Sequence, residues 1–446
     1  MVAADAMSAV TSDRTTAGDF ARLVLLENSK HQYTMSEAFI IDAVRTPRGI
    51  GKQGKGALAH LHPQHLAATV LKALAERNNL DTGDVDDVIW GTSTQQGKQS
   101  RDMARMALLD AGYNPKASGV TLDRFCGSGI TSVNFGAATI AAGFEDLVIS
   151  GGCEMMSYTA TLADPTKPNL MDAGNLHLRN TVPQSHQGIC ADAIATLEGI
   201  PRSALDELAY ESQQRAAKAI AENRFAKSVV PVYNEDGTLA LDHEEFPRPQ
   251  TTLEGLASLK PAFEAMGDRP IDEFGNTYAG MIRKVYPDLQ IKYVHHAGNS
   301  SGVVDGSGAL LLASANYIKK SGLKPRARIV AMANVGDSAT LMLNAPVPAA
   351  KKVLAKAGLT VDDIDLWEIN EAFAVVAEKF IRDLKLDRSK VNVNGGAMAL
   401  GHPIGATGSL LIGTVLDELE RTDKKRGLIT MCAAGGMAPA IIIERL

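Results

Sequence analysis

The stretch LDTGDVDDVI, residues 80–89, has a counterpart in LTVDDIDL, residues 359–366. Each stretch begins with a leucine, continues with a short polar step, and reaches Asp-Val-Asp or Asp-Ile-Asp at the start of an apolar run. Short apolar runs bounded by turn residues are typical of buried strands. Because the same order recurs so far along one chain, the sequence predicts two copies of one α/β unit.

Strand and helix patterns alternate around both stretches. The first copy is predicted to contain strands at 38–44, 84–91, 119–125 and 145–152, and helices at 62–79, 100–112 and 129–143. The second copy is predicted to contain strands at 326–336, 361–370, 390–395 and 426–436, and helices at 346–358, 371–385 and 405–420. This alternation indicates βαβ units and a mostly parallel, buried sheet.

A segment of different composition separates the two copies. It contains a loop-like stretch at 163–180 and a clear helix opened by Pro201, and we interpret it as an insertion that forms a lid over a cleft. The predicted division is an extension at 1–35, an N-terminal half at 36–155 and 296–323, a loop domain at 156–295, and a C-terminal half at 324–446. For 272–294, where aromatic residues lie among charged ones, packing on the body and contact with another chain both stay open.

The bulk composition excludes several classes of protein. The chain has 446 residues and a formal net charge of −6, so it lacks the basic excess that nucleic-acid binding requires. No run reaches the roughly 18 apolar residues that span a bilayer. The first 34 residues resemble neither a secretory signal nor a transit peptide, so we interpret Met35 as the functional start and expect a cytoplasmic protein.

Four cysteines, Cys126, Cys153, Cys190 and Cys432, are spread along the chain without a CxxC pair. They form neither a disulfide framework nor a zinc pattern. Cys126 lies between a predicted strand and a small-residue helix, where unpaired N–H groups favour the thiolate. The neighbouring glycines let a carbonyl approach, so the Cys126 N–H can donate to an oxyanion. A reactive and a structural cysteine fit this pattern equally.

Three further polar groups end strands or lie in small-residue loops. His402, in NVNGGAMALGHPIGATGS (392–409), could accept the proton of a cysteine, or it could be structural. Cys432, in ITMCAAGGMAPA (429–440), suits acid–base work or a buried strand end. Asn370, in WEINEAFA (367–374), could cap a helix or orient a water or a substrate oxygen.

The motifs CGSG, NEAFA and NVNGGAMALGHPIGATG, followed by a late cysteine in a Gly/Ala turn, resemble the thiolase family from about residue 36 to residue 446. The β-subunits of bacterial trifunctional fatty-acid oxidation complexes are among the similar members. The resemblance implies an α/β thiolase fold, with two duplicated βαβαβαββ halves in a layered αβαβα core and a loop domain inserted in the first half. It also implies an acyltransferase.

The resemblance further implies roles for individual residues. Cys126 would be the acyl-accepting nucleophile, His402 its base, and Cys432 the acid/base for acetyl-CoA and CoA. One oxyanion hole would be formed by His402 and a water held by Asn370. The other would use the backbone N–H groups of Cys126 and Ala434, where many thiolases have glycine.

For CoA and substrate, the resemblance points to Ser301 and His186 near the pantetheine arm, to Arg248 near the nucleotide, and to Phe373. A turn residue and a solvated charge are the alternatives for Ser301 and Arg248. CoA would be a co-substrate, and neither a metal nor a redox cofactor is expected.

The expected reaction is CoA-dependent cleavage of 3-oxoacyl-CoA to acetyl-CoA and a shortened acyl-CoA in fatty-acid β-oxidation. The expected partners are a second copy, in a homodimer or tetramer, and the α-subunit of an oxidation complex. Condensation of two acetyl-CoA molecules and a non-catalytic acyl-CoA-binding scaffold are the alternatives. A ketosynthase is disfavoured because that family uses two histidines beside its cysteine.

Overall fold

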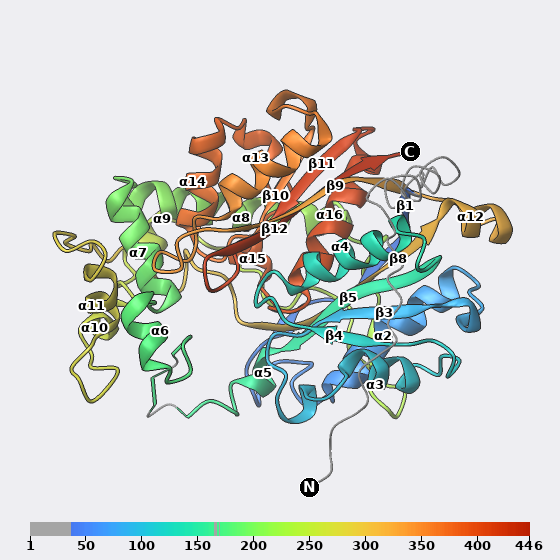
Figure 1. The fold of residues 1–446 in the computed structure, drawn as a ribbon, viewed down its shortest axis with the longest axis horizontal. Coiled ribbons are helices and arrows are strands. Elements are labelled where there is room, and N and C mark those ends of the chain that lie inside the picture. Colours follow the sequence, from blue (N-terminus) through green and yellow to red (C-terminus); the bar gives the residue numbers. More distant parts are fainter. Residues whose placement is uncertain (1–36, 165–166, 169) are drawn as a thin grey trace, which may run out of the picture.

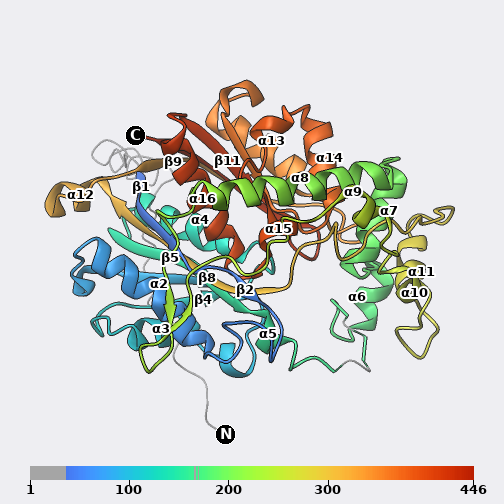
Figure 2. The same cartoon turned by 180° about the vertical axis from the view of Figure 1, so that it is seen from behind.

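The computed structural model describes residues 37–446 except 165, 166 and 169. The predicted extension at 1–35 and the predicted start at Met35 lie outside these residues. The described chain forms alternating layers of sheet and helix, and most helices of the inserted segment lie to one side of them (Figures 1 and 2).

The first half has the element order that its pattern predicts. Its strands are β1 (Ala38–Arg45), β2 (Gly49–Ile50), β3 (Asp87–Gly91), β4 (Val120–Leu122), β5 (Leu147–Met155) and β8 (Val304–Ser314). Its helices are α2 (Pro63–Arg77), α3 (Met103–Asp110), α4 (Ser128–Ala141) and, after β8, α12 (Ala315–Ser321). Apart from the short β2, the order up to β8 is βαβαβαββ.

The second half repeats this order with one difference. Its strands are β9 (Ala327–Gly336), β10 (Leu366–Ile369), β11 (Arg426–Thr430) and β12 (Met437–Arg445), and its helices are α13 (Pro346–Ala357), α14 (Ala374–Leu384), α15 (Ala397–Leu400) and α16 (Thr407–Arg421). The strand predicted at 390–395 is wrong, because only a single bridge joins Val391 to Trp367. The side chain of Asn392 replaces the strand by accepting from the Ile369 N–H (3.0 Å) and donating to the Ile369 carbonyl (2.9 Å).

Equivalent side chains confirm the duplication. Short 3₁₀ turns at Thr82–Asp84 and Val361–Asp363 precede β3 and β10, as the repeated stretches indicate. The Asp86 carboxylate then accepts the N–H groups of residues 146 and 147, and the Asp365 carboxylate accepts those of residues 425 and 426. In both halves, one aspartate therefore fixes the start of the neighbouring parallel strand.

The strands lie in the order β10-β11-β12-β9-β1-β8-β5-β3-β4, and β2 pairs with β8. The halves join at β1 and β9 through only two residue pairs. α2 and α3 cover the outer face of the first half, α13 and α14 cover that of the second, and α4 and α16 pack together between the halves. This arrangement is the predicted αβαβα layering (Figure 1).

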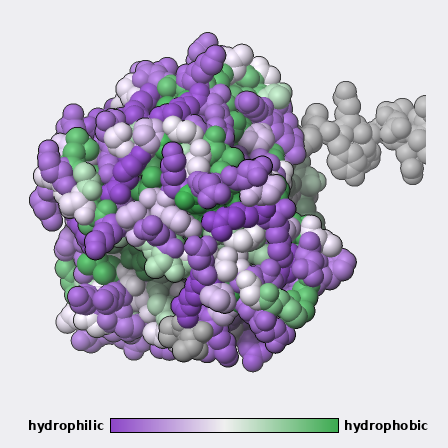
Figure 3. All heavy atoms as spheres, turned by 90° about the vertical axis from the view of Figure 1, so that its left-hand side faces the viewer, coloured by the Kyte–Doolittle hydropathy of each residue, from purple (hydrophilic) through white to green (hydrophobic). Residues whose placement is uncertain are grey.

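The inserted segment carries helices α5 (Met156–Thr159), α6 (Leu176–Thr181), α7 (Gln187–Leu197), α8 (Arg202–Ala221), α9 (Leu253–Ala257), α10 (Glu264–Gly267) and α11 (Tyr278–Arg283), and strands β6 (Val232–Tyr233) and β7 (Leu239–Leu241). Pro201 caps α8, as predicted. The insertion interrupts the first half in the chain, yet α7 and α8 pack against α14 and α15 of the second. Its outward face is mainly hydrophilic (Figure 3).

The open question about 272–294 is answered by its side chains. Tyr278, Met281 and Ile282 are buried in the same core cluster as α7 and α14, so the segment packs on the body. Within the described part of the chain, no helix has both the length and the apolar character needed to cross a membrane.

Candidate active site

Cys126 lies in a tight loop between β4 and α4. Phe125, just before it, has a left-handed backbone with φ of 49°, which bulky residues rarely adopt. Ser128 holds this loop: its Oγ accepts from the Arg124 N–H (2.8 Å) and donates to the Phe125 carbonyl (2.7 Å). A side chain at Gly127 would lie 2.9 Å from Pro439 of β12, so the loop touches the second half.

The thiol of Cys126 is uncharged in this setting. Burial raises its pKa to about 12, against a hydrogen bond from its own N–H, while the charges of Glu154 and Asp123 raise it further. The expectation that the helix N-terminus favours the thiolate is therefore wrong, because desolvation outweighs the helix dipole. Attack by Cys126 requires a base that removes the proton during the reaction.

His402 is placed to be that base. Its N–H donates to the Gly302 carbonyl (2.9 Å), and its ring Nδ1 lies 2.6 Å from Thr407 Oγ1. Thr407 gives its hydroxyl hydrogen to the Pro403 carbonyl, so it accepts from Nδ1–H and leaves Nε2 unprotonated, as an acceptor that faces the Asn370 amide. Burial, and then the charge of Arg48, lowers the pKa of His402 to about 3, which keeps the ring neutral.

Asn370 follows β10 and faces the same histidine. Its Nδ2 lies 3.4 Å from His402 Nε2, and its N–H donates to the Thr430 carbonyl (3.3 Å) at the end of β11. The Asn370 Oδ1 is buried and has no hydrogen-bond partner among the described residues. The helix-cap alternative is wrong, because Phe373 caps α14. An unpartnered amide oxygen beside an imidazole suits a bound water or substrate group.

Cys432 lies two residues beyond β11, close to the nucleophile. Burial, and then the charge of Cys126, raises the pKa of Cys432 above its usual range, so both sulfurs are thiols. The two sulfurs lie close enough for their charges to interact. The structure therefore places Cys126 of the first half near Cys432 of the second, and Asn370 beside His402.

Ala434 lies in the hairpin that follows Cys432. Ala433 and Met437 exchange two backbone hydrogen bonds across it, of 2.7 and 3.1 Å. The left-handed positions of the turn are Gly435 and Gly436, with φ of 76° and 79°, and Ala434 is not among the residues with positive φ. An alanine therefore fits this position without backbone strain.

The predicted pantetheine contacts lie along one path from the site. The Ser301 N–H donates to the carbonyl of Ala372 (3.0 Å), the residue before Phe373. Ser301 directly precedes Gly302, whose carbonyl accepts from the His402 N–H. The rings of Phe373 and Phe263 lie 5.9 Å apart, and those of Phe263 and His186 lie 5.6 Å apart. His186 also caps α7 through Nδ1.

Arg248 is exposed at the end of this path. Its guanidinium lies over the Phe246 ring at 5.7 Å, and a side chain at Gly302 would collide with that ring. Its N–H donates to Gln213 Oε1 (2.8 Å), while Gln213 Nε2 donates to the Met398 carbonyl (3.2 Å). The structure therefore places Arg248 apart from the thiols and linked to the loop before His402.

Two buried glutamates hold the loops on either side of His402, and the sequence analysis assigned a role in the site to neither. Glu154, at the end of β5, accepts from the N–H groups of Ser93 (2.9 Å), Thr94 (3.2 Å) and Gly405 (2.9 Å), and so joins the first half to the loop after His402. The signal was present in the sequence, because an acid that ends an otherwise apolar strand needs buried partners.

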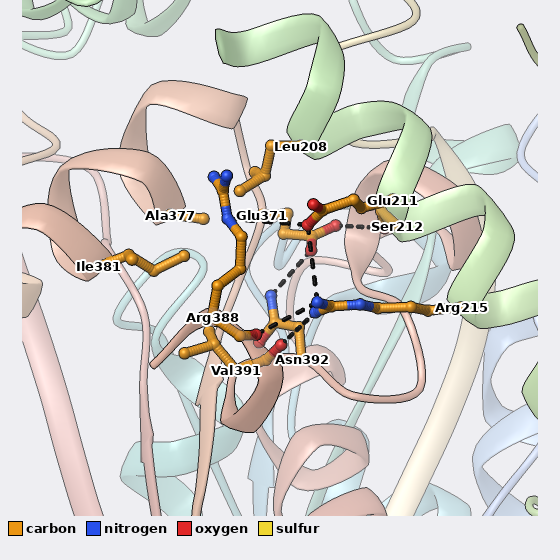
Figure 4. A pocket seen from close by; sticks show the side chains of 10 residues that line it. All are labelled: Leu208, Glu211, Ser212, Arg215, Glu371, Ala377, Ile381, Arg388, Val391 and Asn392. Atoms are coloured by element: carbon orange, nitrogen blue, oxygen red, sulfur yellow. Dashed lines mark hydrogen bonds and ion pairs between the residues drawn. The ribbon is translucent and has the colours of Figure 1, made fainter. Parts of the chain in front are cut away.

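Glu371, next to Asn370, holds the loop before His402. Its carboxylate accepts from Ser212 Oγ (2.7 Å), Asn392 Nδ2 (2.8 Å) and the Met398 N–H (3.2 Å). A small pocket between α8 and α14 reaches this carboxylate from outside (Figure 4). The pocket is lined by α8, α14 and residues 388–392, and neither a cysteine nor His402 lines it.

Comparisons with known proteins agree with this geometry. Residues 38–269 match the model of the thiolase N-terminal domain, and residues 323–445 match that of the thiolase C-terminal domain. The chain belongs to the thiolase family, and it is an acyltransferase with the thiolase fold. CoA thioesters are the substrates of this family.

Individual relatives narrow the comparison. The chain is 41% identical to a β-ketoadipyl-CoA thiolase of Escherichia coli, over 92% of this chain and all of that protein. It is 39% identical to a steroid 3-ketoacyl-CoA thiolase of Mycobacterium tuberculosis, over 92% of this chain and 95% of that one. The crystal structure of a Bacillus anthracis acetyl-CoA acetyltransferase superposes with a TM-score of 0.78 at 32% identity, covering 93% of this chain and all of the other.

Proposed function

We propose that the protein cleaves 3-oxoacyl-CoA with CoA, giving acetyl-CoA and an acyl-CoA shortened by two carbons, as a thiolytic step of fatty-acid β-oxidation. One observation carries the proposal. The Cys126 thiol lies close enough to the Cys432 thiol for their charges to interact, and the neutral His402 imidazole, whose Nε2 is an acceptor, lies 3.4 Å from the Asn370 amide. This set supplies one nucleophile and two separate proton carriers.

The first half-reaction transfers the acyl group to the enzyme. Cys126 Sγ bonds to the 3-keto carbon while its proton passes to His402 Nε2. The oxyanion then collapses, the bond between C2 and C3 breaks, and its electron pair forms the enolate of acetyl-CoA. Imidazolium N–H and a water on Asn370 hydrogen-bond the enolate oxygen, and Cys432 gives its proton to C2.

The second half-reaction regenerates the enzyme. An incoming CoA thiol gives its proton to the Cys432 thiolate, and the CoA sulfur attacks the acyl carbon. The backbone N–H groups of Cys126 and Ala434 would receive the oxyanion that forms. Cys126 leaves as a thiolate and recovers its proton from His402, so every proton is returned. The scheme uses CoA as a co-substrate and draws on no metal or redox cofactor.

The substrate class rests on the relatives and on the chemistry of the site. The two relatives named above act, by their names, on a β-ketoadipyl-CoA and on a steroid 3-ketoacyl-CoA. Both names describe a CoA thioester that is larger than acetoacetyl-CoA and has a keto group at C3, which supports cleavage of a 3-oxoacyl-CoA over condensation of two acetyl groups.

The test compares CoA-dependent cleavage of acetoacetyl-CoA, 3-oxoadipyl-CoA and a long-chain 3-oxoacyl-CoA, with Cys126→Ala as the control. We expect the highest kcat/KM for the long-chain substrate and no cleavage by the variant. A preference for acetoacetyl-CoA would select the acetyl-CoA condensation alternative. If wild type and variant are equally inert on all three, the protein is a scaffold and the proposal fails.

We also propose that the chain forms a homodimer or a tetramer. β4 ends the sheet, and Val120 on it is 44% exposed beside Met106 and Leu109 of α3, which are 38% and 41% exposed. An open edge strand with apolar neighbours can pair with a second copy. Light scattering should give at least two copies for the wild type and one for Val120→Lys, whereas Leu239→Lys, on the exposed β7, should leave the mass unchanged. The predicted α-subunit stays a prediction.

A further inference from the structure

A buried cluster of three charged residues lies behind His402. Arg45 and Arg48 both pair with Glu244 of the inserted segment, at 2.5 and 3.2 Å, and the Arg48 N–H also donates to the same carboxylate (3.0 Å). All three side chains are more than nine-tenths buried. Arg45 also lies over the Phe225 ring at 4.9 Å.

This cluster contains more positive charge than negative. Burial alone would raise the pKa of Glu244, but Arg45 and Arg48 outweigh burial and hold it below its usual value. Burial lowers the pKa of Arg48 to about 10, so it stays charged at neutral pH. The nearby Glu368 does not compensate, because burial and then Glu371 raise its pKa well above the usual range. One carboxylate therefore faces two guanidinium groups.

Several donors of the cluster are unpaired. Arg45 Nε, Arg45 Nη2 and Arg48 Nε are buried without a hydrogen-bond acceptor in the part of the chain that the structure describes. A buried charge without full compensation destabilises the fold. A loss of fold stability that is confined to one place in a core is typical of a functional site.

The position of Arg48 relates the cluster to the base. β2 pairs with β8 so that Gly49 lies opposite Asp305, which places Arg48 opposite Gly306. A side chain at Gly306 would lie 3.1 Å from Pro403, the residue that follows His402. Arg48 is also the charged group that lowers the pKa of His402.

We propose that Arg48, held by Glu244, is a positioning residue that acts through His402: its charge adds to burial in opposing a proton on the imidazole of the free enzyme, and it makes the imidazolium a stronger hydrogen-bond donor to the enolate oxygen. This inference rests on the proposed cleavage reaction. A fixed positive charge costs no reorganisation when negative charge appears nearby, and in a buried site it is weakly screened.

The proposal predicts opposite effects on two measurements. In Arg48→Met, the imidazolium becomes easier to form, so the Cys126 thiolate is more populated and iodoacetamide alkylates Cys126 faster at pH 7. The same change weakens the donor to the enolate, so kcat for cleavage falls by about tenfold, less than the loss of a direct oxyanion donor. Loss of packing alone would lower kcat without accelerating alkylation through His402.

Glu244→Gln provides the matched control, because it makes the cluster more positive. It should slow the alkylation of Cys126, whereas Arg48→Lys, which restores the charge, should bring both rates back toward wild type. In a His402→Ala background, Arg48→Met should leave the alkylation rate unchanged. If Arg48→Met and Glu244→Gln shift alkylation in the same direction, the proposal is wrong. Alkylation needs no thiolase substrate, so this result is separate from the fate of the proposed function.

Discussion

Gly129 of α4 and Gly408 of α16 touch at the centre of the molecule. A Cβ atom on Gly129 would lie 2.8 Å from the Gly408 N atom, and one on Gly408 would lie 2.6 Å from the Gly129 carbonyl carbon. The two glycines occupy the second position of their helices and are 279 residues apart, the same spacing that separates Ser128 from Thr407. The duplicated helices therefore meet at equivalent residues, directly after Cys126 and His402.

This contact makes the site depend on a glycine that bears no chemistry. Gly129→Ala should destabilise the fold by about 1–3 kcal/mol, because the new methyl meets backbone atoms that cannot rotate away. Because the start of α4 must then move from the start of α16, kcat should fall as well. Urea unfolding and thiolysis assays measure the two effects.

Gly413→Ala is the matched control, because Gly413 lies on α16, the helix that also carries Gly408. There the new methyl would meet only the Ala43 side chain, at 3.3 Å. Its unfolding free energy should change by less than about 1 kcal/mol, since alanine also gains helix propensity. Equal losses in both variants would contradict the importance of the central contact.

His402 makes the fold sensitive to acid. Its pKa in the folded protein is lowered from 6.5 to about 3, so the unfolded chain binds its proton first as pH falls. Stability from this group is fully present above pH 6.5 and is lost toward pH 3, by about 1.4 kcal/mol per pH unit. His402→Asn should therefore show a shallower fall of unfolding free energy between pH 6.5 and 4. Parallel curves for both proteins would contradict a buried neutral imidazole.

Glu371 should matter for stability and for the loop that carries His402. Glu371→Leu leaves Ser212 Oγ, Asn392 Nδ2 and the Met398 N–H without their acceptor (Figure 4). We expect a loss of about 3 kcal/mol, since each buried unpaired donor costs about 1–3 kcal/mol. Chemical denaturation measures this loss.

Glu211→Gln gives the comparison for this prediction. Glu211 lies one residue before Ser212 on α8, but its side chain is 37% exposed and its contacts with Arg215 and Arg388 are 3.6 and 3.7 Å long. An exposed pair of this kind contributes about 0–1 kcal/mol. Stability losses of similar size in the two variants would show that the buried network is not what holds the loop.

The sequence predicts features that repeat or that lie in one continuous stretch. The alternation of apolar runs predicts the two halves, and the glycine-rich motifs predict Cys126, His402, Asn370 and Cys432, because each motif is local. Arg48 and Glu244 are 196 residues apart, and Glu154 bonds Gly405 across 251 residues. The sequence around each of these residues does not indicate its distant partner, so these contacts could not be predicted.

The ionisation of Cys126 is a different kind of failure. The helix N-terminus that favours a thiolate is present, but its effect is smaller than the desolvation that raises the pKa to about 12. Burial depends on how both halves close over the loop, which a helix-start motif does not encode. The fold could be predicted from the sequence, and the charge state of the site could not.

Cys153 lies in the first half where Cys432 lies in the second. The Asp86 and Asp365 contacts align residue 147 with residue 426, and the same 279-residue spacing aligns Cys153 with Cys432. Cys153 is fully buried, and its thiol donates to the carbonyl of Pro63, the first residue of α2, at 3.6 Å. α13 begins at Pro346, four residues later than the position aligned with Pro63, so one helical turn is missing above Cys432.

The extra turn of α2 therefore closes over Cys153, and α13 lacks the corresponding turn over Cys432. Cys153→Ala should keep kcat within about twofold and cost about 1 kcal/mol of stability, as expected for a small buried truncation. Cys432→Ala should lower kcat by about 10²–10⁴, the usual contribution of a positioned proton donor. An alkylation assay adds a second distinction, because iodoacetamide should still alkylate Cys126 in the Cys432→Ala variant. If Cys153→Ala lost activity as completely as Cys432→Ala, both copies would take part in the chemistry, and the closure by α2 would not be what distinguishes them.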